Sequence, residues 1–294
     1  MSAWLDELRR VLDASARPVA FFFRDDDAGW ADDELYALLD LFARRALPVD
    51  LAAIPCAVTP ALAAELRARV AAEPDKVAVH QHGFAHLNHE PAGRKCEFGD
   101  ARPRELQRRD IELGRRLLVE LHGLPVGHVF TPPWNRCTAI TGACLRTAGF
   151  RVLSRDATAP PLNVAGLAEL PVTFDWFARR KGVGLARAER GALLAAAATE
   201  ATNRQTPVGV MFHHAQMDAA EMACADELLA LVAAHANARC RLMCELAEPT
   251  CELTEPSARV AAHAAGSVER PAATPHDNRK ALMPHDGLKG VNYA

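Results

Sequence analysis

Short apolar runs rich in β-branched and aromatic residues alternate along the chain with segments that have helical spacing. Strands that alternate with helices predict parallel β–α–β units, and the number of such units favours a closed or nearly closed barrel over an open sheet. We therefore expect a distorted (β/α) barrel of about seven parallel strands with the helices outside. The expected strands are Val19–Arg24, Val49–Ile54, Val77–His80, Val126–Phe130, Arg151–Ser154, Leu170–Phe174, Val208–Phe212 and Cys240–Leu246.

The segments between these runs have the pattern of amphipathic helices. Thr59 and Pro60 are typical of a helix start, because threonine caps the first amides and proline fits the first turn. Apolar stripes are formed by Leu35, Leu38, Leu39 and Phe42, by Ile111, Leu117, Leu118 and Leu121, and by Leu228, Leu229, Leu231 and Val232.

The alternating pattern stops after Glu248. The remaining residues are rich in alanine, proline, histidine and charge, with few large apolar side chains. This composition buries too little apolar surface to offset the entropy of ordering the chain. We expect residues 1–252 to form one barrel domain and residues 253–294 to be a poorly ordered tail that is dispensable for folding.

Composition and charge indicate which partners and which cellular location to expect. Half of the 294 residues are hydrophobic and the formal net charge is −3, which does not suggest a nucleic-acid or membrane-surface partner. The first 18 residues mix acidic and basic side chains with leucines, as in an amphipathic helix, and do not resemble a signal peptide. No apolar stretch of about 18 residues is present. The eight cysteines are scattered, as expected of reduced thiols in a cytoplasmic protein.

Polar residues gather where the predicted strands end. Because the carboxyl ends of parallel barrel strands converge on one face, these groups are expected to line one pocket. They are Asp25 to Asp27, His80 to His86, Thr131 to Asn135, Asp175 with Trp176, and His213 with His214.

Two of these motifs carry metal-binding groups. Asp25, Asp26 and Asp27 follow an apolar strand, where adjacent carboxylates are costly unless a cation neutralises them or one acts as a base. A solvated acidic turn is the simpler alternative. His82 and His86 have a spacing that places two imidazoles on one face of a helical turn, although two surface histidines would give the same spacing. With an aspartate they describe a catalytic zinc-type centre with open positions.

Two other strand ends carry groups suited to catalysis. Pro132 and Pro133 restrict the turn before Trp134 and hence the direction of its amide N–H, which could stabilise an oxyanion. His213 and His214 must point to opposite faces of their strand, so one of them is expected to face the pocket as a general acid. An ordinary proline-rich loop and a satisfied core histidine are the alternatives.

The order of these motifs resembles that of the polysaccharide deacetylase superfamily. Paired aspartates, His-x3-His, an aromatic turn with proline, an Asp-Trp pair and a late histidine follow one another from Asp26 to His214. The likeness is strongest to the branch whose first motif reads Arg-x-Asp-Asp-x-Gly, matched here by Arg24 to Gly29.

The resemblance implies a divalent metal ion held by Asp27, His82 and His86. The implied ion is Zn²⁺, with Co²⁺, Ni²⁺, Mn²⁺ and Fe²⁺ as alternatives. The other implied positions are Asp26 as the base, the backbone N–H of Trp134 in the oxyanion hole, His213 as the general acid, and Asp175 beside that acid.

Three positions depart from the family pattern or leave the assignment open. Thr131 stands where the family commonly has an arginine that orients the base, so that another cation, Arg24 or Arg136, has to substitute. The third aspartate leaves two registers for base and ligand, Asp26 with Asp27 or Asp25 with Asp26. His214 is the alternative to His213.

The resemblance implies removal of an acyl group, acetyl above all, from an acylated sugar or glycoconjugate. A hydrolase of a small amide or cyclic ureide, and a barrel that binds sugar or metal without catalysis, are the alternatives. The chain has two tyrosines and no repeated aromatic platform typical of long glycan grooves. A small, nucleotide-linked or lipid-linked glycoside is therefore the expected substrate.

Overall fold

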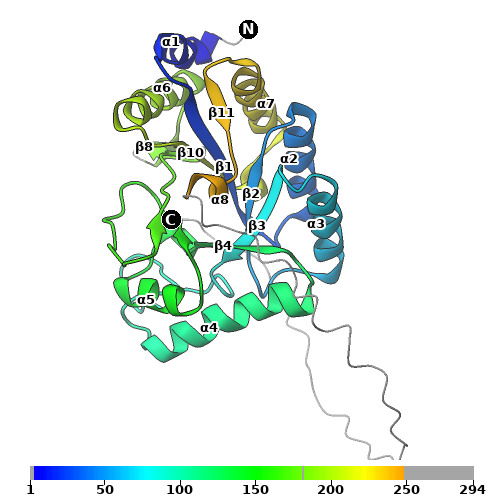
Figure 1. Cartoon of the computed structure of the whole chain (residues 1–294), viewed down its shortest axis with the longest axis vertical. Coiled ribbons are helices and arrows are strands. Elements are labelled where there is room, and N and C mark those ends of the chain that lie inside the picture. Colours follow the sequence, from blue (N-terminus) through cyan, green and yellow to red (C-terminus); the bar gives the residue numbers. More distant parts are fainter. Residues whose placement is uncertain (1–2, 181, 248–294) are drawn as a thin grey trace, which may run out of the picture. The chain divides into compact units, whose positions relative to one another are not determined.

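The strand β1, Val19–Ala28, lies at the centre of the sheet and is buried along almost its whole length. It pairs in parallel with β10 (Val208–Phe212) on one side and with β2 (Val49–Ala53) and β11 (Ala238–Cys240) on the other (Figure 1). A strand buried on both faces needs apolar residues at successive positions, which the run Val19 to Phe23 provides. The computed structural model describes residues 3–180 and 182–247.

The main sheet has nine strands, and all of its strand pairs are parallel. Its order is β6-β5-β4-β3-β2-β1-β10-β7, with β11 paired to β1. Within the described ranges the end strands β6 and β7 are not paired with each other, so the expected distorted barrel is confirmed and is incompletely closed. The remaining strands are β3 (Val77–His82), β4 (Val126–Thr131), β5 (Val152–Leu153), β6 (Ala168–Glu169), β7 (Phe174–Asp175) and, in a separate hairpin, β8 (Arg179–Arg180) and β9 (Val183–Gly184).

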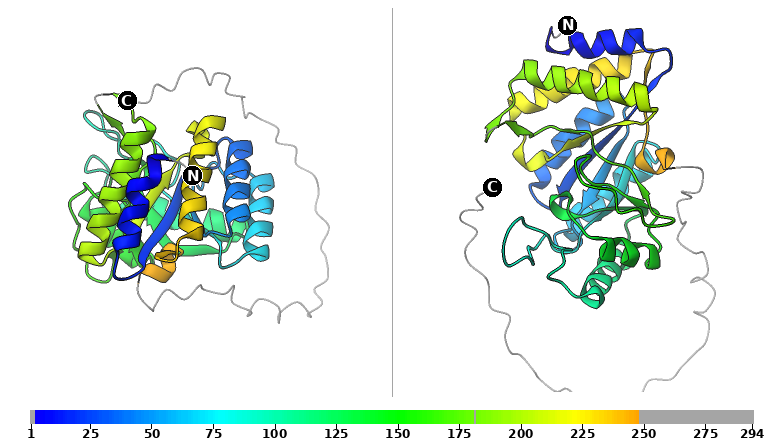
Figure 2. Two further views of the ribbon diagram at one scale, coloured as in Figure 1. Left: turned by 90° about the horizontal axis from the view of Figure 1, so that it is seen from above. Right: turned by 90° about the vertical axis from the view of Figure 1, so that its left-hand side faces the viewer.

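Helices surround the sheet, with α2 beside α3 on one side and α1 beside α6 on another (Figure 2). Thr59 caps α3 as expected, since its hydroxyl accepts the amide of Leu62. The helices are α1 (Asp6–Ala14), α2 (Asp32–Arg45), α3 (Pro60–Ala72), α4 (Arg104–Arg116), α5 (Ala139–Thr147), α6 (Arg187–Arg204), α7 (Ala219–Ala234) and α8 (Met243–Leu246). Shorter helical turns are η1 (Ala3–Leu5), η2 (Leu117–Leu121), η3 (Pro133–Asn135) and η4 (His214–Gln216).

Two strand predictions are wrong in part. The segment Leu170–Phe174 is largely irregular, because Pro171 lacks the amide that a strand ladder requires. The predicted strand Cys240–Leu246 ends as β11 at Cys240, and its second half is the helix α8. The Glu245 carboxylate accepts the amide of Leu242 and so caps that helix. The strand β10 coincides with the predicted segment.

The barrel core lies between the sheet and the helices α1, α2, α6 and α7. Phe23, Phe42, Phe212 and Trp176 are fully buried there and pack with ring centroids 5.0–6.2 Å apart. None of the described helices is long and apolar enough to cross a membrane. The seven cysteines of the described ranges are all free thiols. The predicted domain boundary and tail, 253–294, lie outside the described residues.

Candidate metal centre and catalytic site

Three consecutive aspartates at the end of β1 lie in three different environments, because the pairing register between β1 and β2 is interrupted there. Asp25 pairs with Leu51 of β2, whereas Ala28 pairs with Ala53, so that β1 has one residue more than β2 over this interval. Such a bulge breaks the alternation of side chains along the strand. Asp27, within the bulge, has a φ of 71°, which turns its side chain out of the normal alternation.

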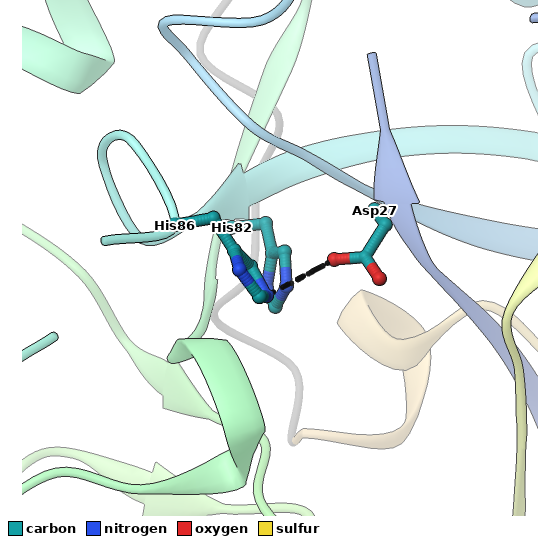
Figure 3. Close-up of side chains that lie close together, drawn as sticks. All are labelled: Asp27, His82 and His86. Atoms are coloured by element: carbon teal, nitrogen blue, oxygen red, sulfur yellow. Dashed lines mark hydrogen bonds and ion pairs between the residues drawn. The ribbon is translucent and has the colours of Figure 1, made fainter. Parts of the chain in front are cut away.

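Asp27, His82 and His86 form a cluster whose ligand atoms all lie within 4.8 Å of one another. The Nε2 atoms of His82 and His86 lie 3.1 and 3.2 Å from the same oxygen, Oδ1 of Asp27. Figure 3 shows the two imidazoles side by side, with both pointing at the carboxylate. Two imidazole nitrogens and one carboxylate oxygen that converge on one point are a donor set for a divalent ion.

His82 is held in the tautomer that a metal ligand needs. Its Nδ1 lies 3.0 Å from the carbonyl oxygen of Thr131. A carbonyl can only accept, so Nδ1 carries a proton and donates it, which leaves Nε2, beside Asp27, as the nitrogen that can bind a metal ion. Burial lowers the pKa of the second imidazole, His86, to about 4, so that this ring is neutral as a ligand must be.

The expected helical turn between the two histidines is not present. His82 is the last residue of β3, and His86 lies in an irregular loop with a φ of 56°. Gly83 begins this loop with a φ of 58°, and a Cβ there would overlap Pro133 and Glu97. The two imidazoles therefore meet through a tight loop after a strand, not through the repeat of a helix.

Glu97 fixes this loop. Its carboxylate is fully buried and accepts the backbone amides of Phe84, Ala85 and Leu87 at 3.0, 2.8 and 3.4 Å. Nothing in the sequence singled out Glu97, because its partners are main-chain amides that only the folded loop presents. Hydrogen bonds from amides to a carboxylate are among the stronger ones, so Glu97 orients His86 through the backbone.

Asp26 lies outside the metal cluster and is paired with Arg24. The Nε and Nη2 of Arg24 donate to the two oxygens of Asp26 at 2.8 and 2.9 Å. Burial opposes the ionisation of Asp26, but Arg24 together with His82 and His213 outweighs burial and holds the pKa of this carboxyl below its usual value. Of the two arginines expected to substitute for a cation at Thr131, Arg24 pairs with Asp26, whereas Arg136 donates to the carbonyl of Lys95.

Asp25 contacts His214 and does not belong to the metal cluster. Its carboxylate accepts the backbone amide of His214 at 3.0 Å and lies 2.6 Å from Nδ1 of the same residue. The Nε2 of His214 donates to the carbonyl oxygen of Trp30 at 2.6 Å. Burial opposes a charge on this imidazole, yet Asp25 raises the pKa of His214 to about 9. Both side chains are fully buried and form an ion pair that is not part of the metal cluster.

His213 follows the last residue of β10 and lies near the carboxylates of Asp26 and Asp27. Its imidazole favours the charged forms of Asp26 and Asp27 against the effect of burial on their pKa values. Its Nδ1 is buried and has no hydrogen-bond partner in the described part of the chain. Asp175 lies close enough to feel this charge, although burial raises the pKa of Asp175, whose Oδ1 accepts the amide of Phe177.

Trp134 forms one wall of the centre. Its ring centroid lies 4.4 Å from that of His86, and its φ of 55° is left-handed, so its amide does not follow the direction of an ordinary turn. Asn135, the next residue, accepts a hydrogen bond from Nη2 of Arg24 at 2.7 Å. The turn therefore contacts both the metal-binding histidines, through His86, and the Asp26–Arg24 pair, through Arg24.

The chain matches no family model and no curated protein. It is similar to the crystal structure of a "putative polysaccharide deacetylase" from Mycobacterium smegmatis, with 17% sequence identity, a TM-score of 0.60, and coverage of 80% of this chain and 90% of that chain. It is also similar to a wild-type CE4 family pseudoenzyme from Bacillus anthracis, with 11% identity, a TM-score of 0.50, and coverage of 79% of this chain and 66% of that chain.

At these identities the likeness concerns the fold. The chain has the fold of the polysaccharide deacetylase superfamily, and the resemblance expected from its motifs is confirmed at that level. One of these structures is named a pseudoenzyme. The fold therefore does not decide whether the chain is active, and activity has to be argued from the residues of the site.

Proposed function

We propose that this chain is a metal-dependent hydrolase of the polysaccharide deacetylase superfamily, which removes an acetyl group from an acylated sugar or glycoconjugate. The observation that carries the proposal is the convergence of Asp27, His82 and His86 beside a separate, arginine-bound carboxylate, Asp26. A set of metal ligands next to a carboxylate that is not itself a ligand is what hydrolysis of an acyl group requires. A barrel without catalysis would need neither the base nor its arginine.

The ligand set fits a divalent ion, for which we propose Zn²⁺. Two neutral imidazoles and one carboxylate leave a coordination position open, as in catalytic zinc sites. The hydrogen bond from His82 to Thr131 supplies the outer support that such ligands usually have. When bound, the ion lowers the pKa of water and polarises an acyl carbonyl.

Three groups of the protein then supply the base, the oxyanion donor and the general acid. Asp26, fixed and kept ionised by Arg24, accepts the proton of the attacking water. The amide N–H of Trp134 donates to the oxygen of the acyl group as negative charge develops there. His213 protonates the departing amine or alcohol, because its imidazole lies near Asp26 and Asp27 and is not a member of the ligand set.

Acetate release is the direct assay of this proposal. Metal-loaded protein is incubated with N-acetylated sugars, O-acetylated sugars and small amides or cyclic ureides. We expect acetate from the first or second class. Ring opening of a ureide without release of acetate would instead support the small-amide alternative, and the absence of hydrolysis in every class would contradict the proposal.

We expect the wild-type protein to bind one divalent ion, and His82→Ala and His86→Ala to lose most of it. Each variant leaves two ligands, too few for tight binding. Elemental analysis of purified protein measures this effect. The matched control is His89→Ala, an exposed histidine in the same loop region, which should retain the metal. Equal metal content in all four proteins would show that the ligand set is misassigned.

We expect His213→Ala to lower kcat by about 10²-fold with unchanged metal content, because a general acid contributes 10²–10⁴-fold and is not a ligand. The loss should be smallest for substrates with good leaving groups, which need little protonation. Steady-state kinetics with an acetyl ester of a phenol and an N-acetyl sugar tests this difference. A His213→Ala variant with wild-type kcat on both substrates would remove the residue from the mechanism.

A further inference from the structure

A cavity of about 400 Å³ adjoins the candidate metal centre. Trp134 and Asn135 form part of its wall, and these are the residues that contact the His86 ring and Arg24. One layer of side chains therefore separates the cavity from both a metal ligand and the partner of the base. This is the position for the part of a substrate beyond its acyl group, and the volume is within the range of small-molecule sites.

Two arginines line this cavity without acidic partners. Arg94 is exposed, and Arg136 is half-buried with one hydrogen bond, to the carbonyl of Lys95. Neither forms an ion pair with a carboxylate among residues 3–180 and 182–247. Burial and the nearby Arg94 charge lower the pKa of Arg136, so the two guanidinium groups lie close enough to repel each other. An anion between them would offset that repulsion.

A third guanidinium in the same wall has spare hydrogen-bonding capacity. Arg155 is 5% exposed, and its Nη2 donates to Glu169 and to the carbonyl of Pro160. Its Nε is buried and has no hydrogen-bond partner within the described ranges. A buried donor without a partner is costly, which points to an acceptor that a ligand brings into the cavity.

The two carboxylates that line the cavity, Asp156 and Asp175, form no ion pair with Arg94 or Arg136 in the described part of the chain. Asp156 accepts the amide and hydroxyl of Thr158, and Asp175 accepts the amide of Phe177. Their remaining lone pairs are acceptors for hydroxyl groups, which a sugar ring carries. The lining thus combines guanidinium donors for an anion with carboxylate acceptors for hydroxyls.

We infer that the substrate is an acylated compound of about monosaccharide size that bears a phosphate or carboxylate group, and that Arg94 and Arg136 bind this group. The inference rests on the proposed function and specifies its substrate class. Planar guanidinium groups bind both anions with two hydrogen bonds each, so phosphate and carboxylate are distinguished by the experiment.

The test is calorimetric binding of deacetylated ligands to zinc-loaded, full-length protein, because binding of products requires no turnover. The ligands are glucosamine, which has no anionic group, glucosamine 6-phosphate, with a phosphate on O6, and muramic acid, with a carboxylate on a lactyl ether at O3. In wild type we expect at least one anionic ligand to bind about tenfold or more tightly than glucosamine, as lost charge-assisted hydrogen bonds predict. The larger ratio identifies the anion.

In the double variant Arg94→Gln/Arg136→Gln the ratio should fall to within about twofold. The matched control Arg44→Gln, an exposed arginine on α2, should keep the wild-type ratio. A ratio near one in wild type, no measurable binding of any ligand, or a ratio that persists in the double variant overturns the inference. Arginine-dependent binding together with no acetate release from any acetylated ligand would reject the hydrolase and leave the anion site standing.

Discussion

The Asp26→Asn variant is expected to retain its metal ion and to lose at least about 10²-fold in kcat, the order of effect of a lost general base. Asparagine keeps the shape of the side chain, and its Oδ1 can still accept one of the two hydrogen bonds from Arg24, but it cannot take up a proton. Asp26 is not part of the cluster of Asp27, His82 and His86, so metal binding has no reason to change. Acetate-release kinetics and elemental analysis on the same preparation measure both quantities.

The matched control for this variant is Asp75→Asn, an exposed aspartate between α3 and β3, which should behave as wild type. A loss of metal from Asp26→Asn would shift the register, with Asp26 as the ligand and Asp25 as the base. The contacts of Asp25 oppose that register, because its carboxylate is already occupied by the amide and imidazole of His214.

The His214→Ala variant is expected to lower the free energy of unfolding by about 3–5 kcal/mol, the cost of leaving one member of a buried ion pair without its partner. The substitution would leave the carboxylate of Asp25 fully buried without its imidazole and would free the carbonyl of Trp30. Denaturant unfolding measures the change. The exposed His89→Ala control should alter stability by about 0.5 kcal/mol or less.

The contrast with His213 makes this prediction specific. His213→Ala should lose turnover with little change in stability, because its imidazole makes no hydrogen bond through Nδ1. A His214→Ala protein that is as stable as wild type and inactive would exchange the roles of the two histidines. For that reason both unfolding and kinetics are required of each variant.

The sequence predicts the barrel and the position of the site because both follow from periodic patterns. Apolar strands alternating with helices require parallel units, and parallel units bring their carboxyl ends to one face. The sequence likewise predicts different environments for His213 and His214, and they differ, although both residues lie beyond the end of β10 at Phe212. These predictions depend on local order and need no knowledge of which loop packs against which strand.

The details that the sequence could not supply depend on non-periodic backbone. The bulge in β1 sends Asp25 and Asp27 to different partners, and nothing in three identical residues reveals where the bulge falls. The loop after β3 replaces the expected helical turn, since Gly83 and His86 both adopt positive φ. Glu97 is recognisable only once that loop presents its amides.

The fold shows which arginine pairs with Asp26 although the position of Thr131 carries no arginine. Thr131 lacks the charge that the family commonly places there, and the sequence left two candidates for a substitute. Arg24 and Asp26 lie two apart on one strand, so their side chains share a face and form the pair. The spacing of two residues predicts this pair only if the strand continues through Asp26, as β1 does.

The most direct test of the account is acetate release from acetylated sugars by one preparation in three states: as metal-free protein after chelation, after addition of one equivalent of Zn²⁺, and after the same addition to His82→Ala. The account predicts no release from metal-free protein, restored release with zinc, and none from the variant. Release at the same rate by metal-free and zinc-loaded protein would contradict it.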